Sequence, residues 1–168
     1  ERSEREKQEL EKLYEQMESE LIKLEAVLEQ LPSGVTIVEA PSGRLLYHNA
    51  QGDRLLGHPV IRMDSYQGDA QYGPLHKDGT IYKPEEYPIV RALLGENISM
   101  EEIPYRRGDG TLTYLSISAS PIRDLEGNIV AAVSIFNDVA DRKRAEDALR
   151  ESEEKLRNIV ENSTNVFY

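Results

Sequence analysis

Apolar residues within the first 31 positions recur at alternating steps of four and three residues. Glu, Lys and Gln fill most of the intervening positions, and neither Gly nor Pro interrupts the series. This seam is typical of a coiled coil, because a helix that packs on its own domain usually carries a wider apolar stripe. We predict a helix over 1–31 that pairs two copies of the chain; an amphipathic helix lying on its own domain is the alternative. The seam consists of Leu10, Tyr14, Met17, Leu21, Leu24, Leu28 and Leu31.

The pattern changes after the breaker Pro32-Ser33-Gly34 and predicts one α+β domain over 32–137. Pro88 and Gly95 bracket a helix over 88–94 within a mixed region of short helices and loops. The order predicts a five-stranded antiparallel sheet with short helices on one side. Strand signals occur at 35–39, 44–49, 101–107, 111–120 and 129–137, the last reached through 122–125 and a turn.

Alternation within the last two strands assigns their faces. Leu115, Ile117 and Ala119 should point to the side that the helices cover. The final strand carries apolar residues on both faces, as Phe136 and Ile135 illustrate. We therefore predict that both faces of this strand are covered, the second one by the flanking helices.

A charged helix is predicted over 138–161, directly after the last strand and with no Gly or Pro between them. Asp138 and Asp141 have the spacing of an N-terminal capping box. Apolar positions in this helix form a weaker seam, in which Arg142, Ala and Ser occupy three of six places, and a weak seam favours an adjustable pairing. The segment 156–162 repeats the pattern of 24–30, so 162–168 is interpreted as the start of a second copy of the domain.

Composition limits the classes of partner. Acidic residues outnumber basic ones by 31 to 20, which argues against nucleic acid and anionic membrane surfaces. The chain has no Cys, which excludes disulfides and thiolate ligands and fits a reducing, cytoplasmic environment. No apolar run approaches the roughly 20 residues that span a bilayer, so direct membrane insertion is not expected. Because the chain begins at Glu1, we expect it to be a piece of a longer protein.

Three segments together resemble the PAS, or sensory-box, family of bacterial and archaeal signalling proteins. They are LLYHNAQGDRLLGHP (45–59), PEEYPIVRALLGE (84–96) and the long run from EEIPYRRGDG to ESEEKL (101–156). Asn49 and Gly57 match the recurring Asn and Gly of the family, and the similarity extends over 24–146. Asp138-Val139-Ala140 is similar to the family's Asp-Ile-Thr motif, except that Ala140 lacks the hydroxyl of the usual Thr.

This resemblance implies a PAS fold and a sensory module that passes a signal through its flanking helices. Asp138, Asp141 and Arg142 are the expected signal-coupling residues. The implied output is a histidine kinase in two-component phosphorelay signalling, and neighbouring PAS and output domains are the implied partners. The alternative is a ligand-free dimerisation and interaction module in a tandem array, with another output such as a cyclase or a transcription regulator.

No enzymatic motif is present, and His48, His58 and His76 are too scattered to predict a metal site. In the family, haem is commonly ligated by a His on the helix before the third strand, and 88–94 contains none. The light-sensing flavin branch needs an adduct-forming Cys, which is absent. The sequence thus argues against haem and flavin, and the fragment itself is not expected to be an enzyme.

A small organic ligand in the domain core is a second open question. The inward-facing set is mostly apolar, with phenols, an amide and a hydroxyl that could orient a small carboxylate, an aromatic molecule or a lipid tail. The same residues could simply fill the core, with Phe136 as a plug. The candidate pocket consists of Asn49, Leu56, Met63, Tyr87, Val90, Ile103, Tyr105, Leu115, Ile117, Ser134 and Phe136, and the wider inward set adds Val35, Ile37 and Leu93.

Overall fold

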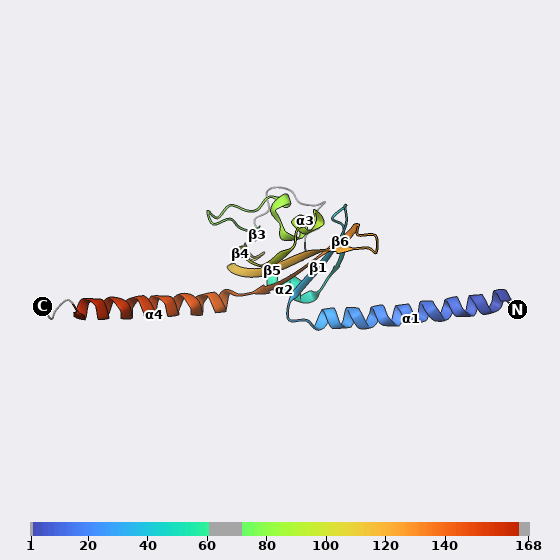
Figure 1. The fold of residues 1–168 in the computed structure, drawn as a ribbon, viewed down its shortest axis with the longest axis horizontal. Helices are drawn as coiled ribbons and strands as arrows, with labels where there is room; N and C mark the ends of the chain where they lie inside the picture. The colour runs from blue at the N-terminus through green and yellow to red at the C-terminus, as the bar shows by residue number, and fades with distance from the viewer. Residues whose placement is uncertain (1, 61–71, 165–168) are drawn as a thin grey trace.

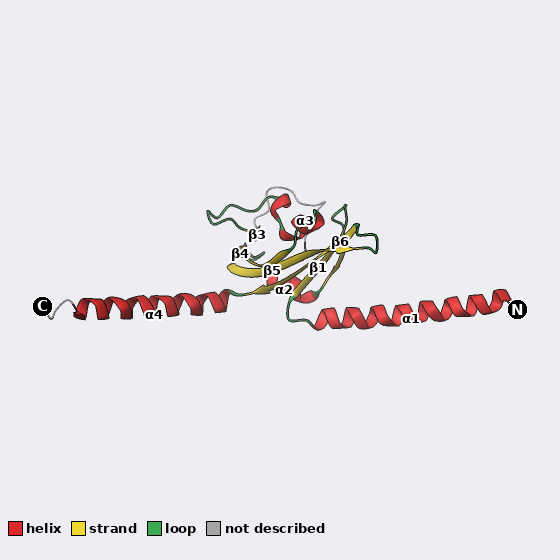
Figure 2. Ribbon diagram, viewed as in Figure 1, coloured by secondary structure: helices red, strands yellow, loops and turns green. Residues whose placement is uncertain are grey.

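Two long helices extend from opposite ends of a central domain and place the termini far apart (Figure 1). The structure is a computed structural model that describes residues 2–60 and 72–164. Between the helices α1 and α4, the chain forms a sheet with α3 over one of its faces (Figure 2). The elements are α1 (Arg2–Gln30), β1 (Gly34–Glu39), β2 (Leu45–His48), α2 (Ala50–Leu56), β3 (Gly73–Pro74), the 3-10 helix η2 (Pro84–Glu86), α3 (Pro88–Leu93), β4 (Ile98–Arg106), β5 (Leu112–Arg123), β6 (Ile129–Asp138) and α4 (Ala140–Thr164).

The sheet is antiparallel and has the strand order β2-β1-β6-β5-β4-β3. The prediction of an α+β fold with this sheet is confirmed, except that there are six strands and not five. The additional strand, β3, has only two residues, which pair with Tyr105 and Arg106 of β4. Its brevity, within a region rich in Gly and Pro, explains why no alternating pattern revealed it.

The helix-covered face of the sheet carries the core. In β5, Leu115, Ile117 and Ala119 are buried, as their alternation predicted. Ala92 of α3 packs against Ala119 and against Ala132 of β6. Small side chains at these contact points let the short helix approach the sheet closely.

Phe136 of β6 fills the space between β1 and α2. Its ring lies so close to Gly34 that a Cβ there would stand 2.3 Å from the ring, and the same Cβ would stand 2.9 Å from the backbone of Gly52. Real carbon atoms do not approach so closely, so Gly34 is required by packing, whereas a Cβ on Gly52 would come no closer than 3.4 Å to any neighbour. Phe136 is thus held beside the cavity described below, where the sequence suggested a plug.

The opposite face of the sheet is only partly covered, so the prediction that the flanking helices cover it is wrong for this chain. Ile135 remains 42% exposed and Tyr114 41% exposed. The reason is geometric: β6 continues into α4 after the single residue Val139, so the helix leads outward and does not fold back onto the sheet. Figure 1 shows α1 leaving the domain in the opposite direction.

The helix boundaries differ little from the predicted ones. α1 ends at Gln30, and α4 runs through Thr164, three residues beyond the predicted boundary at 161. Residues 165–168 lie outside the described part of the chain, so the start of a second domain remains a prediction. Within the described residues, no helix combines the length and the apolar character that a membrane span requires.

Candidate functional site

A cavity of about 140 Å³ lies between the covered face of the sheet and the segments around α2, η2 and α3. We refer to it as the central cavity. Strands β1, β4, β5 and β6 supply one wall, and the helical segments and the loop after α2 supply the other. The described residues that line it are Thr36, Val38, Gly43, Leu45, Leu56, His58, Val60, Tyr72, Pro74, Pro84, Tyr87, Pro88, Ile89, Tyr105, Leu115, Ile117, Ser134 and Phe136.

Most of the predicted pocket residues line this cavity. They are Leu56, Tyr87, Tyr105, Leu115, Ile117, Ser134 and Phe136. Asn49, Val90 and Ile103 are not among the lining residues, and neither is Leu93. Met63 lies outside the described residues, and whether any of these side chains binds a ligand remains a prediction.

The inward assignment of Val35 and Ile37 was wrong by one residue of register. β1 begins at Gly34, which pairs with Phe136, so Thr36 and not Val35 faces the cavity together with its partner Ser134. A shift of one position exchanges the two faces of a strand. The sequence could not reveal this, because β1 carries β-branched residues on both faces.

His58 is a wall residue that the sequence did not single out. Its Nδ1 lies 2.6 Å from the carbonyl oxygen of Pro59, and its Nε2 lies 2.7 Å from the hydroxyl of Tyr105. A carbonyl can only accept, so Nδ1 carries the proton, and in the neutral ring Nε2 accepts from Tyr105. Burial lowers the pKa of His58 and raises the pKa of Tyr105, so both groups are held neutral.

The three histidines are not brought together. His48 lies 3.4 Å from a carboxylate oxygen of Asp53, and His76 lies 3.2 Å from one of Glu86. Each therefore has a partner of its own in its own part of the fold, as the scattered sequence positions suggested.

Asn49 joins three elements and is fully buried. Its Oδ1 accepts hydrogen bonds from the backbone N–H groups of Val35 and Gly52, each at 3.0 Å. Its Nδ2 donates to the carbonyl oxygens of Leu28 and Ser33, each at 2.9 Å. The side chain therefore caps α2 while tying it to the end of α1 and to β1, which is a structural role and not pocket lining.

Glu29 strengthens the attachment of α1 to α2. One of its oxygens accepts from the hydroxyl of Tyr47 at 3.0 Å, and the other accepts from the backbone N–H of Ala50 at 3.2 Å. Burial, together with the carboxylate of Glu29, raises the pKa of Tyr47 to about 12. The C-terminal turn of α1 is thus fixed to the first residue of α2.

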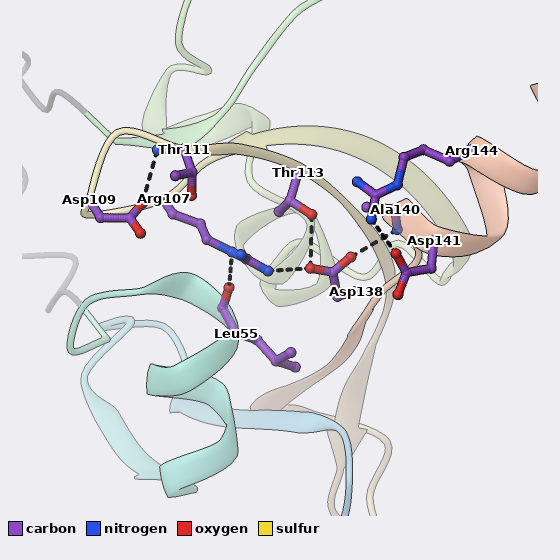
Figure 3. Close-up of polar contacts among 9 residues, drawn as sticks. All are labelled: Leu55, Arg107, Asp109, Thr111, Thr113, Asp138, Ala140, Asp141 and Arg144. Atoms are coloured by element: carbon purple, nitrogen blue, oxygen red, sulfur yellow. Dashed lines mark hydrogen bonds and ion pairs between the residues drawn. The ribbon is translucent and has the colours of Figure 1, made fainter.

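Asp138 holds the junction between β6 and α4 (Figure 3). Its Oδ1 accepts from the backbone N–H of Ala140 at 2.8 Å, and its Oδ2 accepts from the hydroxyl of Thr113 at 2.8 Å. The same carboxylate pairs with Arg107, whose Nε donates to the carbonyl oxygen of Leu55 at 3.0 Å. Asp138 therefore caps the helix and links it through Arg107 to the C-terminal end of α2.

The two other predicted coupling residues behave differently. Asp141 forms an exposed ion pair with Arg144, and no reciprocal bond from the Asp138 N–H to Asp141 occurs among the described residues. The predicted capping box is therefore incomplete. Arg142 pairs with Glu102 of β4 and with Glu146.

Lys143 completes the attachment of the first turn of α4 to the sheet. Its Nζ lies 2.6 Å from Glu102 and 5.1 Å from the ring centre of Tyr114. Hydrogen bonds from Lys143 and Arg142 lower the pKa of the Glu102 carboxyl group. The backbone N–H of Val139 also donates to the carbonyl oxygen of Tyr114 at 2.9 Å. Side chains of β4 and β5 thus hold the helix where it leaves the sheet.

The seam of α1 is exposed. Leu10, Met17 and Leu21 are 54%, 53% and 58% exposed, and only Leu28 and Leu31 near the domain are half-buried. The alternative in which this helix lies on its own domain is therefore excluded. Pairing with a second copy of the chain remains a prediction.

Comparison with known proteins agrees with this architecture. A family model described as the PAS fold matches residues 28–144. This chain belongs to the PAS family. Its PAS domain includes the end of α1, the whole sheet and the first turn of α4.

Individual relatives are more distant. The chain is 27% identical over 139 residues to sporulation kinase A of Bacillus subtilis (strain 168), which covers 83% of this chain and 22% of the relative. The chain therefore spans about a fifth of the length of that curated relative.

A solved sensory box histidine kinase/response regulator from Burkholderia thailandensis E264 matches 81% of this chain and 98% of its own, with a TM-score of 0.52 and 20% identity. An RNA-binding light-oxygen-voltage receptor matches 78% of this chain and 36% of its own, with a TM-score of 0.54 and 20% identity. These structural matches show the fold.

In this PAS domain, the carboxylate of Asp138 finds hydrogen-bond donors although position 140 is Ala and not Thr. Ala140 can offer only its backbone N–H, and the hydroxyl that hydrogen-bonds Asp138 comes from Thr113 on the neighbouring strand. The carboxylate thus accepts a side-chain hydroxyl from β5, while Arg107 supplies the opposite charge.

Asp138→Ala is expected to lower the free energy of unfolding by about 2 kcal/mol, because a helix cap and a charge-assisted contact are lost together. The amide of Ala140 should also exchange faster with solvent. Urea denaturation and amide exchange measure the two effects.

Asp141→Ala is the matched control, because it removes an exposed ion pair two positions inside α4. It should change the free energy of unfolding by less than about 0.5 kcal/mol. Equal effects of the two substitutions would contradict the special role of Asp138.

Proposed function

We propose that this PAS domain senses the occupancy of its central cavity and converts it into a change in how α4 is held. The supporting observation is the position of α2, which lines the cavity, is attached to α1, and is linked through Arg107 to Asp138 just before α4. Leu56 lines the cavity. Asn49 and Glu29 attach the start of α2 to α1, and the carbonyl of Leu55 attaches its end to Arg107. A ligand that shifts α2 would therefore act on both attachments.

The final strand offers a second route to α4. Ser134 and Phe136 line the cavity, and β6 ends only two residues later at Asp138. With Val139 alone between strand and helix, no flexible linker separates them. A displacement of the end of β6 would therefore move the start of α4, because the contacts of Asp138, Arg142 and Lys143 hold the first turn of the helix to the sheet.

The larger protein is proposed to be a histidine kinase in two-component signalling. Similarity to sporulation kinase A supports this output, and the exposed, charged α4 suits a connection to a following domain. In this proposal the fragment itself senses and does not catalyse.

A cavity-filling substitution tests the sensing proposal without a ligand. Ser134→Leu places a larger apolar side chain in the cavity and mimics occupancy. We expect the opening free energies of the Ala140 and Lys143 amides to change by about 0.5–2 kcal/mol, the usual range of coupling between sites. Site-resolved hydrogen exchange by NMR provides the measurement.

Ser120→Leu is the control, because Ser120 pairs with Val133 and so lies on the opposite face of the sheet. This variant should leave the exchange of both amides as it is in the unaltered chain. Identical exchange in the Ser134→Leu variant and the unaltered chain would refute coupling between the cavity and α4.

The exposed seam of α1 favours the second candidate, a dimerisation module that needs no ligand. Five of its residues are more than half exposed in a single copy. Pairing in a coiled coil would remove these apolar side chains from water. The two candidates are compatible in one protein, since pairing through α1 leaves the central cavity unchanged.

Leu21→Glu is expected to convert a dimer into a monomer, because it places a charge in the seam. The adjacent Ile22→Glu is the matched control, since Ile22 is equally exposed, 61% against 58%, but lies outside the seam. Light scattering should give a dimer for the unaltered chain and for Ile22→Glu. A monomeric unaltered chain, or equal effects of the two substitutions, would remove the coiled-coil proposal.

A further inference from the structure

The central cavity contains two side-chain hydroxyls that have no hydrogen-bond partner among the described residues. Thr36 of β1 and Ser134 of β6 face each other across the strand pair and both line the cavity. They are only 7% and 6% exposed. Both residues lie on the cavity wall, and a hydroxyl can donate to and accept from a cavity occupant, so the pair marks a place where an occupant can form hydrogen bonds.

Tyr105 and His58, which also belong to the wall, already have hydrogen-bond partners. The hydroxyl of Tyr105 and both ring nitrogens of His58 are within hydrogen-bond distance of each other or of the carbonyl of Pro59. A ligand gains little by competing for these groups. The Thr36–Ser134 pair is therefore the better anchor, since each hydroxyl can both donate and accept.

The lining residues also constrain the charge of the occupant. None of the described lining residues is Asp, Glu, Lys or Arg. The nearby cation Arg91 is not among them and is engaged by Glu96 and Glu101. Moving an ionised group into an apolar site without a counter-charge is strongly unfavourable. Among the described lining residues, therefore, no Lys or Arg supplies a counter-charge for the small carboxylate that the sequence left open, and the proposal takes an uncharged occupant.

The size of the cavity indicates the scale of the occupant. An engineered apolar cavity of about 150 Å³ accepts benzene, and the central cavity measures about 140 Å³. Its wall is formed by aliphatic and aromatic side chains such as Leu45, Leu115 and Phe136. One ring with a small substituent matches this volume.

We propose that the central cavity binds an uncharged, largely apolar molecule of about one ring, whose carbonyl or hydroxyl group hydrogen-bonds to Thr36 and Ser134. This inference rests on the proposed sensory function and gives the chemical class of the signal. Binding would place a polar group at the centre of β1 and β6, the strands that lead from α1 and into α4.

Three probes of similar size test this assignment. Acetophenone carries a neutral carbonyl, ethylbenzene lacks a polar group, and benzoate carries a charge. Titrations followed by NMR should show acetophenone binding most tightly, ethylbenzene more weakly, and benzoate at least about tenfold more weakly than acetophenone, because its charge is unpaired in the cavity.

Thr36→Val and Ser134→Ala remove the hydroxyls one at a time. Each should weaken acetophenone binding about fivefold, the effect of one hydrogen bond, and change ethylbenzene binding by less than about twofold. Thr36→Ser keeps the hydroxyl and should retain the affinity for acetophenone. The unfolding midpoint of each variant verifies that it is folded under the conditions of the titration.

Benzoate binding as tightly as acetophenone would overturn the proposal, and so would acetophenone binding that neither substitution changes. Failure of both neutral probes to bind would also overturn it. These results leave the sensory function untouched, because the exchange experiment with Ser134→Leu uses no ligand and can succeed where the probes fail.

Discussion

The carboxylate of Asp138 is the contact on which the rest of the arrangement depends. It stands at the end of β6, accepts the first free N–H of α4, and receives the hydroxyl of Thr113 and the guanidinium of Arg107. The first N–H groups of a helix have no partner within the helix. Asp138, at the end of β6, supplies an acceptor for one of these N–H groups. The strand can therefore be followed by α4 with only one residue between them.

Arg107 extends this contact to α2 through the carbonyl oxygen of Leu55. At the other end of α2, Asn49 and Glu29 make the corresponding contacts with α1. A helix of only seven residues thus lines the central cavity, is bonded to α1, and is linked through Arg107 to Asp138 at the end of β6. Because hydrogen bonds hold α2 at both of its ends, a small movement of α2 is expected to affect the contacts at both ends.

Local patterns predicted the elements well and the contacts between them less well. The heptad seam of α1, the alternation of Leu115 and Ile117, and the absence of a breaker after Asn137 each depend on neighbours in sequence, so periodicity revealed them. The facing of β1 depends on its pairing with β6, and its β-branched residues on both sides gave no preference, so Val35 and Ile37 were assigned to the wrong face. The contacts of Asp138 were only partly foreseen, because Thr113 and Arg107 reach it from a hairpin far away in the sequence. His58 was missed for a similar reason: only the fold places it beside Tyr105.

In the proposed mechanism, α2 couples the end of α1 to the start of α4. A double-mutant cycle measures this coupling most directly, with Glu29→Gln and Arg107→Gln introduced singly and together and the opening free energy of the Lys143 amide determined by hydrogen exchange. Coupling through α2 predicts that the two effects fail to add by about 0.5–2 kcal/mol. Strict additivity, with Glu29→Gln leaving the opening free energy of the Lys143 amide unchanged, would show that α2 does not couple the two helices.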